Sequence, residues 1–133
     1  MMNACTDQEA RSAILEIGRR MFARQYVAAN DGNISVRTAP DRIWVTPTGV
    51  SKGYMTEDML LCVDQEGRVL EGTATPSSEM KMHLRVYREN PEVGGVVHAH
   101  PPAATSFAIA RVPMDMALLT ETVFNLGVVP VAP

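Results

Sequence analysis

Two hydrophobic periods alternate along this chain. In residues 7–28, apolar side chains recur at the spacing of one helical face, which predicts an amphipathic helix packed through that face. Its apolar positions are Ala10, Ile14, Ile17 and Met21. Thr6 or Asp7 can cap its start. Beyond it the helical period gives way to short apolar segments bounded by turn-forming residues, as in strands. The chain is therefore expected to form both helices and a sheet.

The strand-like segments come in pairs. Residues 34–37 and 42–45 are separated by the turn-forming residues 39–41, which predicts a hairpin. After a loop and a short helical turn around residues 56–59, the apolar run 60–63 and the turn 65–67 indicate a further strand or strand pair.

A second helix is signalled by residues 75–79, whose hydroxyls can cap it and whose Pro76 is expected in its first turn. It should end near Asn90. Residues 93–100 are typical of an apolar strand that rises from the interior and is ended by Pro101 and Pro102. Residues 103–110 are typical of a third helix. This alternation indicates an α/β layered domain, and the hairpin signals favour a mixed sheet.

Composition narrows the possible partners and locations. A chain of 133 residues, 46% hydrophobic and 20% charged, fits a single globular domain over residues 1–133. A net charge of -3 argues against nucleic acid or an anionic membrane as a partner. No apolar run approaches the roughly 18 residues of a membrane-spanning helix. Cys5 and Cys62 lack CxxC spacing and the start lacks a signal-peptide pattern, so we expect reduced thiols and a cytoplasmic location.

His98 and His100 carry the first chemical signal. Alternate residues of a strand project from one face, so two imidazoles can reach one metal ion, although this pattern alone often belongs to structural histidines. The paired prolines stop the strand where ligands gather in α/β proteins. Glu79 is the natural third ligand, because a carboxylate in the first turn of a helix is stabilised as an anion and can bind a metal or accept a proton. Its alternative role is only to complement the helix dipole.

Three short polar loops could bind a phosphate group. Their amides and hydroxyls could close around one anion, and one loop lies at the start of a helix, where anions bind. Taken singly, each loop is also explained as a turn or a helix cap. The candidate residues are Gly32, Asn33, Thr48, Gly49, Ser77 and Ser78. Lys52 is expected to be a loop charge that could touch an anionic ligand.

His83 lies four residues after Glu79 and therefore on the same helical face, within reach of the same ion. We expect it instead to be a packed or hydrogen-bonded residue of the buried stripe that contains Met80, Leu84 and Tyr87.

Four motifs follow one another along the chain: DGNISVR, TPTGVSKGYM, PSSEMKMH and VVHAHPP. In this order and at these separations they resemble the class II aldolase/adducin family, from the first helix to the last residue. The resemblance implies a three-layer α/β/α domain around a mixed, mainly antiparallel sheet. It also implies one zinc ion per subunit and a homotetramer with active sites at subunit boundaries.

The same resemblance makes His98 and His100 zinc ligands and Glu79 both a ligand of the empty site and the acid/base of the reaction. The six loop residues would hold the phosphate of a small phosphorylated sugar. The implied reaction is aldol cleavage of a ketose 1-phosphate to dihydroxyacetone phosphate and an aldehyde, with zinc stabilising the enediolate that forms.

The sequence departs from the family pattern at three places. No histidine follows His100, although the family takes a third histidine ligand from a later segment. Ala117 stands where a catalytic tyrosine would lie. Residues 128–133 resemble an interrupted strand, so the C-terminal part of the domain is expected to be missing. Three functions stay open: an aldolase, a sugar-phosphate epimerase or dehydratase of the same family, and a non-catalytic binding module such as adducin.

Overall fold

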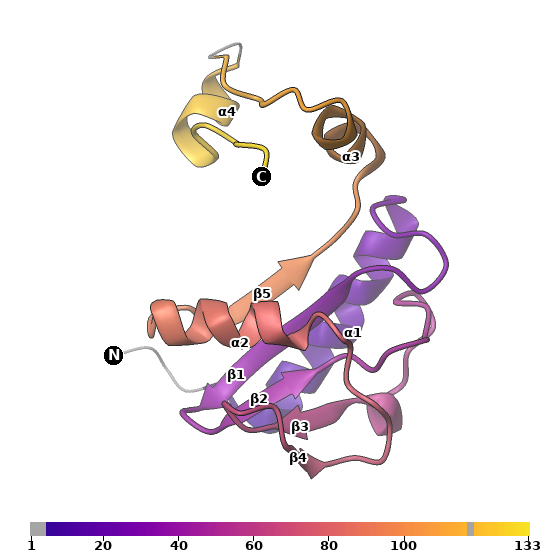
Figure 1. Ribbon diagram of the computed structural model, residues 1–133. Coiled ribbons are helices and arrows are strands. Elements are labelled where there is room, and N and C mark those ends of the chain that lie inside the picture. Colours follow the sequence, from indigo (N-terminus) through magenta and orange to yellow (C-terminus); the bar gives the residue numbers. More distant parts are fainter. Residues whose placement is uncertain (1–4, 117–118) are drawn as a thin grey trace. The chain divides into compact units, whose positions relative to one another are not determined.

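The computed structural model describes residues 5–116 and 119–133 (Figure 1). The chain divides into two compact units, Met1–His100 and Pro101–Pro133. The assignment of the whole chain to one domain stays a prediction.

The first unit is built on a five-stranded sheet in the order β4-β3-β2-β1-β5. The strands are β1 (Asn33–Ala39), β2 (Arg42–Val45), β3 (Leu61–Val63), β4 (Val69–Glu71) and β5 (Gly95–His98). All neighbouring pairs are antiparallel. The predicted hairpin is therefore confirmed as β1 and β2, and the predicted further pair as β3 and β4, which follow the short helix η1 (Glu57–Met59).

The helix α1 (Asp7–Ala23) begins at the predicted cap. The backbone N–H of Glu9 donates to the Thr6 hydroxyl at 3.2 Å, and the backbone N–H of Thr6 donates to the Glu9 carboxylate at 2.8 Å. This reciprocal capping satisfies two N–H groups that the helix leaves unpaired. The helix stops at Ala23 rather than near residue 28, because Gln25 adopts a left-handed conformation with φ 59° and turns the chain.

The helix α2 (Met80–Glu89) begins later than predicted, and Pro76 is not in its first turn. Pro76 instead forms an isolated β-bridge with Pro47, so this segment is held extended against the loop that follows β2. Glu79 is the N-cap residue, and no side chain caps the helix. The buried stripe is confirmed and comprises Met80, His83, Leu84 and Tyr87.

Alternation along the central strands sends apolar side chains to both faces of the sheet. Trp44 and Cys62 pack in a cluster with Ala10 and Ile14 of α1. Their strand neighbours pack on the opposite face with α2, in a cluster that includes Ile43, Val45, Leu61, Val63, Met80 and Leu84. Figure 1 shows the two helices on opposite sides of the sheet. The first unit is thus the three-layer α/β/α arrangement that the family resemblance implies.

Strand β5 is shorter and more exposed than expected. It lies at the edge of the sheet, paired on one side with β1, and Val97 within it is 51% exposed. The expectation that this strand rises from the interior is wrong, because no described strand covers its outer edge.

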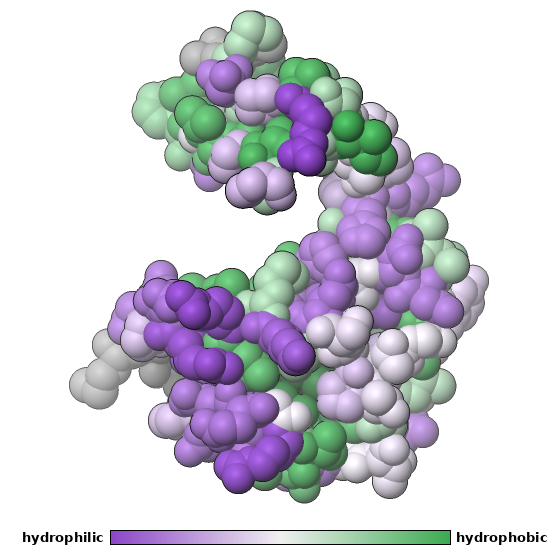
Figure 2. Space-filling view, in the orientation of Figure 1, coloured by the Kyte–Doolittle hydropathy of each residue, from purple (hydrophilic) through white to green (hydrophobic). Residues whose placement is uncertain are grey.

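The second unit contains α3 (Pro102–Ile109) and α4 (Thr120–Asn125), with a bridge between Met114 and Val129. The predicted third helix is therefore confirmed, whereas residues 128–133 form no strand beyond that bridge. Within residues 101–116 and 119–133 no side chain is buried, and apolar groups lie on the surface in Figure 2. Across the described parts of the chain, no helix has the length and apolar character needed to cross a membrane.

Candidate metal site

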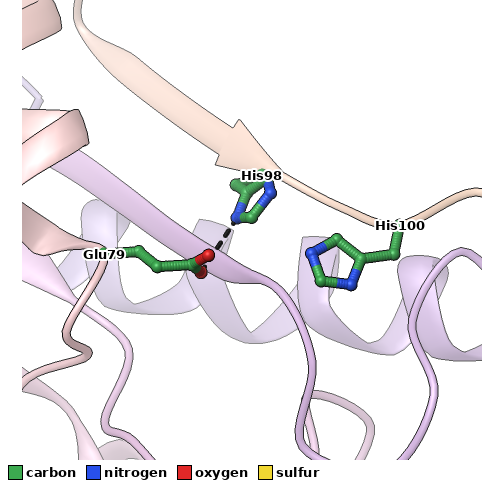
Figure 3. A group of neighbouring side chains, drawn as sticks. All are labelled: Glu79, His98 and His100. Carbon is green, nitrogen blue, oxygen red and sulfur yellow. Dashed lines mark hydrogen bonds and ion pairs between the residues drawn. The ribbon is translucent and has the colours of Figure 1, made fainter. Parts of the chain in front are cut away.

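Glu79, His98 and His100 lie together, as Figure 3 shows. Each offers one ligand atom, and these three atoms all lie within 4.8 Å of one another. His98 Nδ1 is 3.1 Å from Glu79 Oε2, and the two imidazole rings meet edge to face with centroids 4.8 Å apart. Three side chains that the sequence separates by up to 21 positions thus converge on one point.

Sheet register places His98. It is paired with Asn33 across the β1–β5 ladder, and residues directly opposite in an antiparallel pair share a face. Asn33 in turn donates a hydrogen bond to the Glu79 carboxylate, so strand and helix cap meet at this point. His100 lies beyond the end of β5, where its backbone N–H donates to the Tyr26 carbonyl at 2.8 Å.

The donor set fits a divalent cation. Zinc bonds to nitrogen and oxygen are about 2.0–2.2 Å long, so two ligands of one ion lie roughly 3–4 Å apart. The 3.1 Å between His98 Nδ1 and Glu79 Oε2 meets this spacing. Imidazole and carboxylate are both common zinc ligands, and three protein ligands leave a fourth position for another group. The chain contains three histidines, and the third, His83, does not belong to this group.

The charge of Glu79 also suits a cation. Partial burial acts to raise its pKa, but the hydrogen bond from Asn33 and the neighbouring His98 outweigh that effect, and the pKa of Glu79 is lowered. Its side chain is 44% exposed and that of His98 is 24% exposed. An ionised carboxylate is therefore accessible beside the two imidazoles.

The six candidate phosphate residues lie in three loops that are joined by hydrogen bonds. The backbone N–H of Thr48 donates to Thr75 at 2.9 Å, and the Asn33 amide donates to Ser77 Oγ at 3.3 Å. Thr48, Gly49 and Ser78 are exposed, whereas Gly32 and Asn33 are buried. The structure thus brings the three loops together, and Asn33 is the member whose side chain already faces the carboxylate of Glu79.

Gly32 has a conformation and surroundings that only glycine fits. Its φ is +74°, and a Cβ there would lie 2.6 Å from Val27 and 2.8 Å from the carbonyl oxygen of His98. This close approach brings the loop before β1 against the metal-site strand.

Lys52 lies in a loop, as the sequence predicts, but it is buried. It is 1% exposed, and its ammonium donates to the carbonyls of Asn30 at 3.1 Å and Val50 at 2.6 Å. Burial lowers the pKa of Lys52, and the nearby Asp31 partly offsets this. Lys52 therefore ties two loops together through its ammonium, while its backbone carbonyl packs closely against Gly18 of α1.

His83 is the packed and hydrogen-bonded residue that the sequence predicts. It is fully buried and contacts Asn33 and Ser35. Sequence reasoning missed Ser35 and the hydrogen-bonding role of Tyr87, although the alternating polar residues of NISVR signal a polar strand face. Ala117, compared above with a catalytic tyrosine, lies outside the described residues.

Comparisons with known proteins identify relatives of this chain. The profile of the Class II Aldolase and Adducin N-terminal domain matches residues 12–133. A methylthioribulose-1-phosphate dehydratase of Granulibacter bethesdensis is 41% identical over 101 residues, covering 76% of this chain and 47% of that protein. A 3-oxo-tetronate 4-phosphate decarboxylase of Haemophilus influenzae is 37% identical over 103 residues, covering 77% of this chain and 49% of that protein.

Among solved structures, an L-fuculose-1-phosphate aldolase of Thermus thermophilus superposes with a TM-score of 0.76 at 33% identity, covering 90% of this chain and 60% of that one. The chain thus spans about half the length of the two curated relatives named above.

Proposed function

Because this chain belongs to the class II aldolase and adducin family, we propose that it acts as a metal-dependent enzyme on a small phosphorylated sugar, with Glu79, His98 and His100 holding the ion. The observation that carries this proposal is the convergence of their three ligand atoms to within 4.8 Å. A purely structural module has no physical need to gather two imidazoles and an ionised carboxylate at an accessible point.

The proposed ion is zinc, one per subunit, because two nitrogens and one oxygen suit it. When bound, it would supply electrophilic stabilisation of negative charge on substrate oxygens. The loop after β2 and the segment before α2 would hold the phosphate through the hydroxyls of Thr48, Ser77 and Ser78 and the backbone N–H of Gly49. On the basis of the family resemblance, we also propose that the protein is a homotetramer in the cytoplasm.

The proposed reaction is aldol cleavage of a ketose 1-phosphate to dihydroxyacetone phosphate and an aldehyde. A base must accept the proton of the hydroxyl on the carbon that becomes the aldehyde, and an acid must then protonate the carbon beside the carbonyl. Glu79 suits both steps in turn, since its lowered pKa makes it a carboxylate before the reaction and its exposed side chain can reach substrate.

Dehydration is the second candidate, favoured by the 41% identity to a methylthioribulose-1-phosphate dehydratase. Aldol cleavage and decarboxylation of a 3-oxo acid leave negative charge on a carbon next to a carbonyl group, and dehydration passes through the same charge when the proton on that carbon is removed before the hydroxyl leaves. One ligand set and one carboxylate can therefore serve each of these reactions, and the product distinguishes them.

Zinc binding and product identity test the proposal separately. We expect about one zinc per wild-type chain by elemental analysis, and at least a tenfold weaker zinc affinity in Glu79→Ala and His98→Ala. Glu89→Ala, at the other end of α2, is the matched control and should bind zinc normally. Equal zinc affinity in all four proteins would reject the site.

Products from a panel of ketose 1-phosphates then decide the reaction. Release of dihydroxyacetone phosphate supports the aldolase, and a product that has lost water without carbon-carbon cleavage supports the dehydratase. Zinc binding without turnover of any of these sugars would favour a binding module.

A further inference from the structure

Strand β1 and helix α2 face each other through two rows of polar side chains. The strand row repeats every two residues, an advance of about 6.6 Å, and the helix row every four residues, an advance of about 6 Å. Because the two advances nearly match, each residue of the strand row lies beside a residue of the helix row. The rows are Asn33, Ser35 and Arg37 on β1, and Glu79, His83 and Tyr87 along α2.

Hydrogen bonds join these rows into one continuous ladder. Tyr87 Oη and Ser35 Oγ are 2.7 Å apart, and Ser35 Oγ is 2.7 Å from His83 Nδ1. His83 Nε2 is 2.5 Å from Asn33 Oδ1, and the Asn33 amide reaches the Glu79 carboxylate. The ladder runs through the interior, because its four members Asn33, Ser35, His83 and Tyr87 are each at most 3% exposed.

The direction of every hydrogen bond follows from the charge of Glu79. A carboxylate accepts only, so Asn33 must present its NH₂ group to Glu79 and its oxygen to His83. His83 must then donate through Nε2, and because a neutral imidazole carries a single N–H, its Nδ1 accepts from Ser35. Ser35, which donates to His83, accepts in turn from Tyr87. All the donors of the ladder therefore point toward Glu79.

Two further observations agree with this direction. Burial, helped by the nearby His98, lowers the pKa of His83 to about 4, which keeps the ring neutral at neutral pH. Both amide hydrogens of Asn33 have acceptors, one on Ser77 and one on Glu79. The Asn33 side chain thus has no donor left for a phosphate group.

We propose that Asn33 and His83 are positioning residues, which fix the rotamer of the Glu79 carboxylate so that it faces His98 and His100. This inference rests on the proposed metal-binding role of Glu79. The Glu79 side chain is 44% exposed, and two described side chains contact its carboxylate, His98 and Asn33. Of these two, Asn33 is the one held by a buried row of hydrogen bonds. Residues that orient a metal ligand in this way typically contribute about 10–100-fold to metal affinity.

Variants of His83 test the proposal through zinc affinity. His83→Leu removes the donor to Asn33 and should weaken zinc binding about 10–100-fold. His83→Gln can place an amide N–H near the position of Nε2 and should restore most of the affinity. The loss should shrink along the ladder, with Ser35→Ala below His83→Leu and Tyr87→Phe smaller still.

Leu84→Ala is the structural control. Leu84 is buried on the same helix without a place in the ladder, so its variant should lower the melting temperature and leave zinc affinity unchanged. Zinc affinities that follow the melting temperatures across these variants, or an unchanged affinity in His83→Leu, would overturn the proposal.

Experiments on metal-free protein separate this inference from the proposed function. Nitrogen NMR should find His83 protonated at Nε2 and not at Nδ1, and a crystal structure of His83→Leu should show the Glu79 carboxylate displaced. The opposite tautomer or an unmoved carboxylate contradicts the ladder, whatever the zinc result. If both results are obtained and wild-type protein binds no zinc, the proposed function fails and the ladder still orients Glu79.

Discussion

The two faces of the sheet are packed in different ways. On one face, the strands pack with α1 in an apolar cluster that includes Ile14 of the helix and Ile34 and Trp44 of the strands. Against α2, an apolar cluster covers the middle of the sheet, while β1 meets the helix through hydrogen-bonded polar groups. Burial of apolar area stabilises without regard to direction, whereas a hydrogen-bonded row fixes orientation at a modest net gain in stability.

This difference suggests that the α1 face mainly stabilises the fold and the α2 face mainly orients the candidate site. We expect substitutions on the α1 face to change mainly the free energy of unfolding, and substitutions in the ladder of the α2 face to change mainly metal affinity and turnover. Each of the variants below tests one side of this division.

Glu79→Gln should have the largest effect, on turnover. The amide cannot accept the proton, so kcat should fall about 10²–10⁴-fold, equivalent to roughly 3–5 kcal/mol. Stability and phosphate binding should change little, because the side chain keeps its size. Steady-state kinetics with Glu89→Gln as control checks this, and a fully active Glu79→Gln would reject the acid/base role.

Ile14→Ala should produce the largest loss of stability. Ile14 is fully buried between α1 and the sheet, and such truncations cost about 2–5 kcal/mol. Ile109, which is 78% exposed, provides the control Ile109→Ala, expected within about 0.5 kcal/mol of wild type. Chemical denaturation measures both, and zinc affinity well below the unfolding transition should match wild type. A zinc defect in Ile14→Ala would break the division between the faces.

Gly32→Ala should lower the free energy of unfolding more than Gly49→Ala does, although both glycines have positive φ, +74° and +72°. The backbone conformation alone costs about 1 kcal/mol in each. A Cβ at residue 32 would also clash with Val27 and His98, whereas one at residue 49 meets nothing within 4 Å. We expect a total of about 2–3 kcal/mol for Gly32→Ala, within the range for overpacking. Equal losses of unfolding free energy would contradict the close approach.

Asp7→Asn should have the smallest effect and a defined pH dependence. Hydrogen bonds from Arg42 and Thr38 lower the pKa of Asp7 from 3.8 to about 2. The ionised folded form is therefore favoured above pH 4, and this stabilisation is lost as pH falls from about 4 to 2. Because the side chain is 38% exposed, we expect less than about 1 kcal/mol at pH 7.

Unfolding free energies of wild type and Asp7→Asn should accordingly converge as pH falls from about 4 to 2. Asp41→Asn, in the turn between β1 and β2, is the control. A difference that persists unchanged at pH 2 would assign the effect to packing and not to charge.

Much of the fold could be predicted from local patterns. Capping at Thr6, the hairpin of β1 and β2 and the buried stripe of α2 each depend on neighbours within a few residues, which sequence periodicity records. The start of α2 and the end of α1 were misplaced, because a bridge between Pro47 and Pro76 and a left-handed Gln25 decide them. Those features depend on tertiary contacts or on one backbone angle.

The residue types of the candidate site could also be predicted, but the hydrogen bonds that connect these residues could not. The sequence grouped Glu79, His98 and His100 by chemistry, and the structure brings them together. It did not indicate that Lys52 is buried or that the Asn33 amide is committed to Glu79, because both facts depend on how distant segments pack.

The matched spacing of β1 and α2 sets a rule for how descendants of this gene can vary. Loops outside these two elements can gain or lose residues without disturbing the pairing. A single deletion inside Asn33–Ala39 would turn the following strand side chains to the opposite face, and one inside α2 would rotate the remaining helix by about 100°. Point substitution is therefore the route by which this region can evolve, with paired changes on strand and helix.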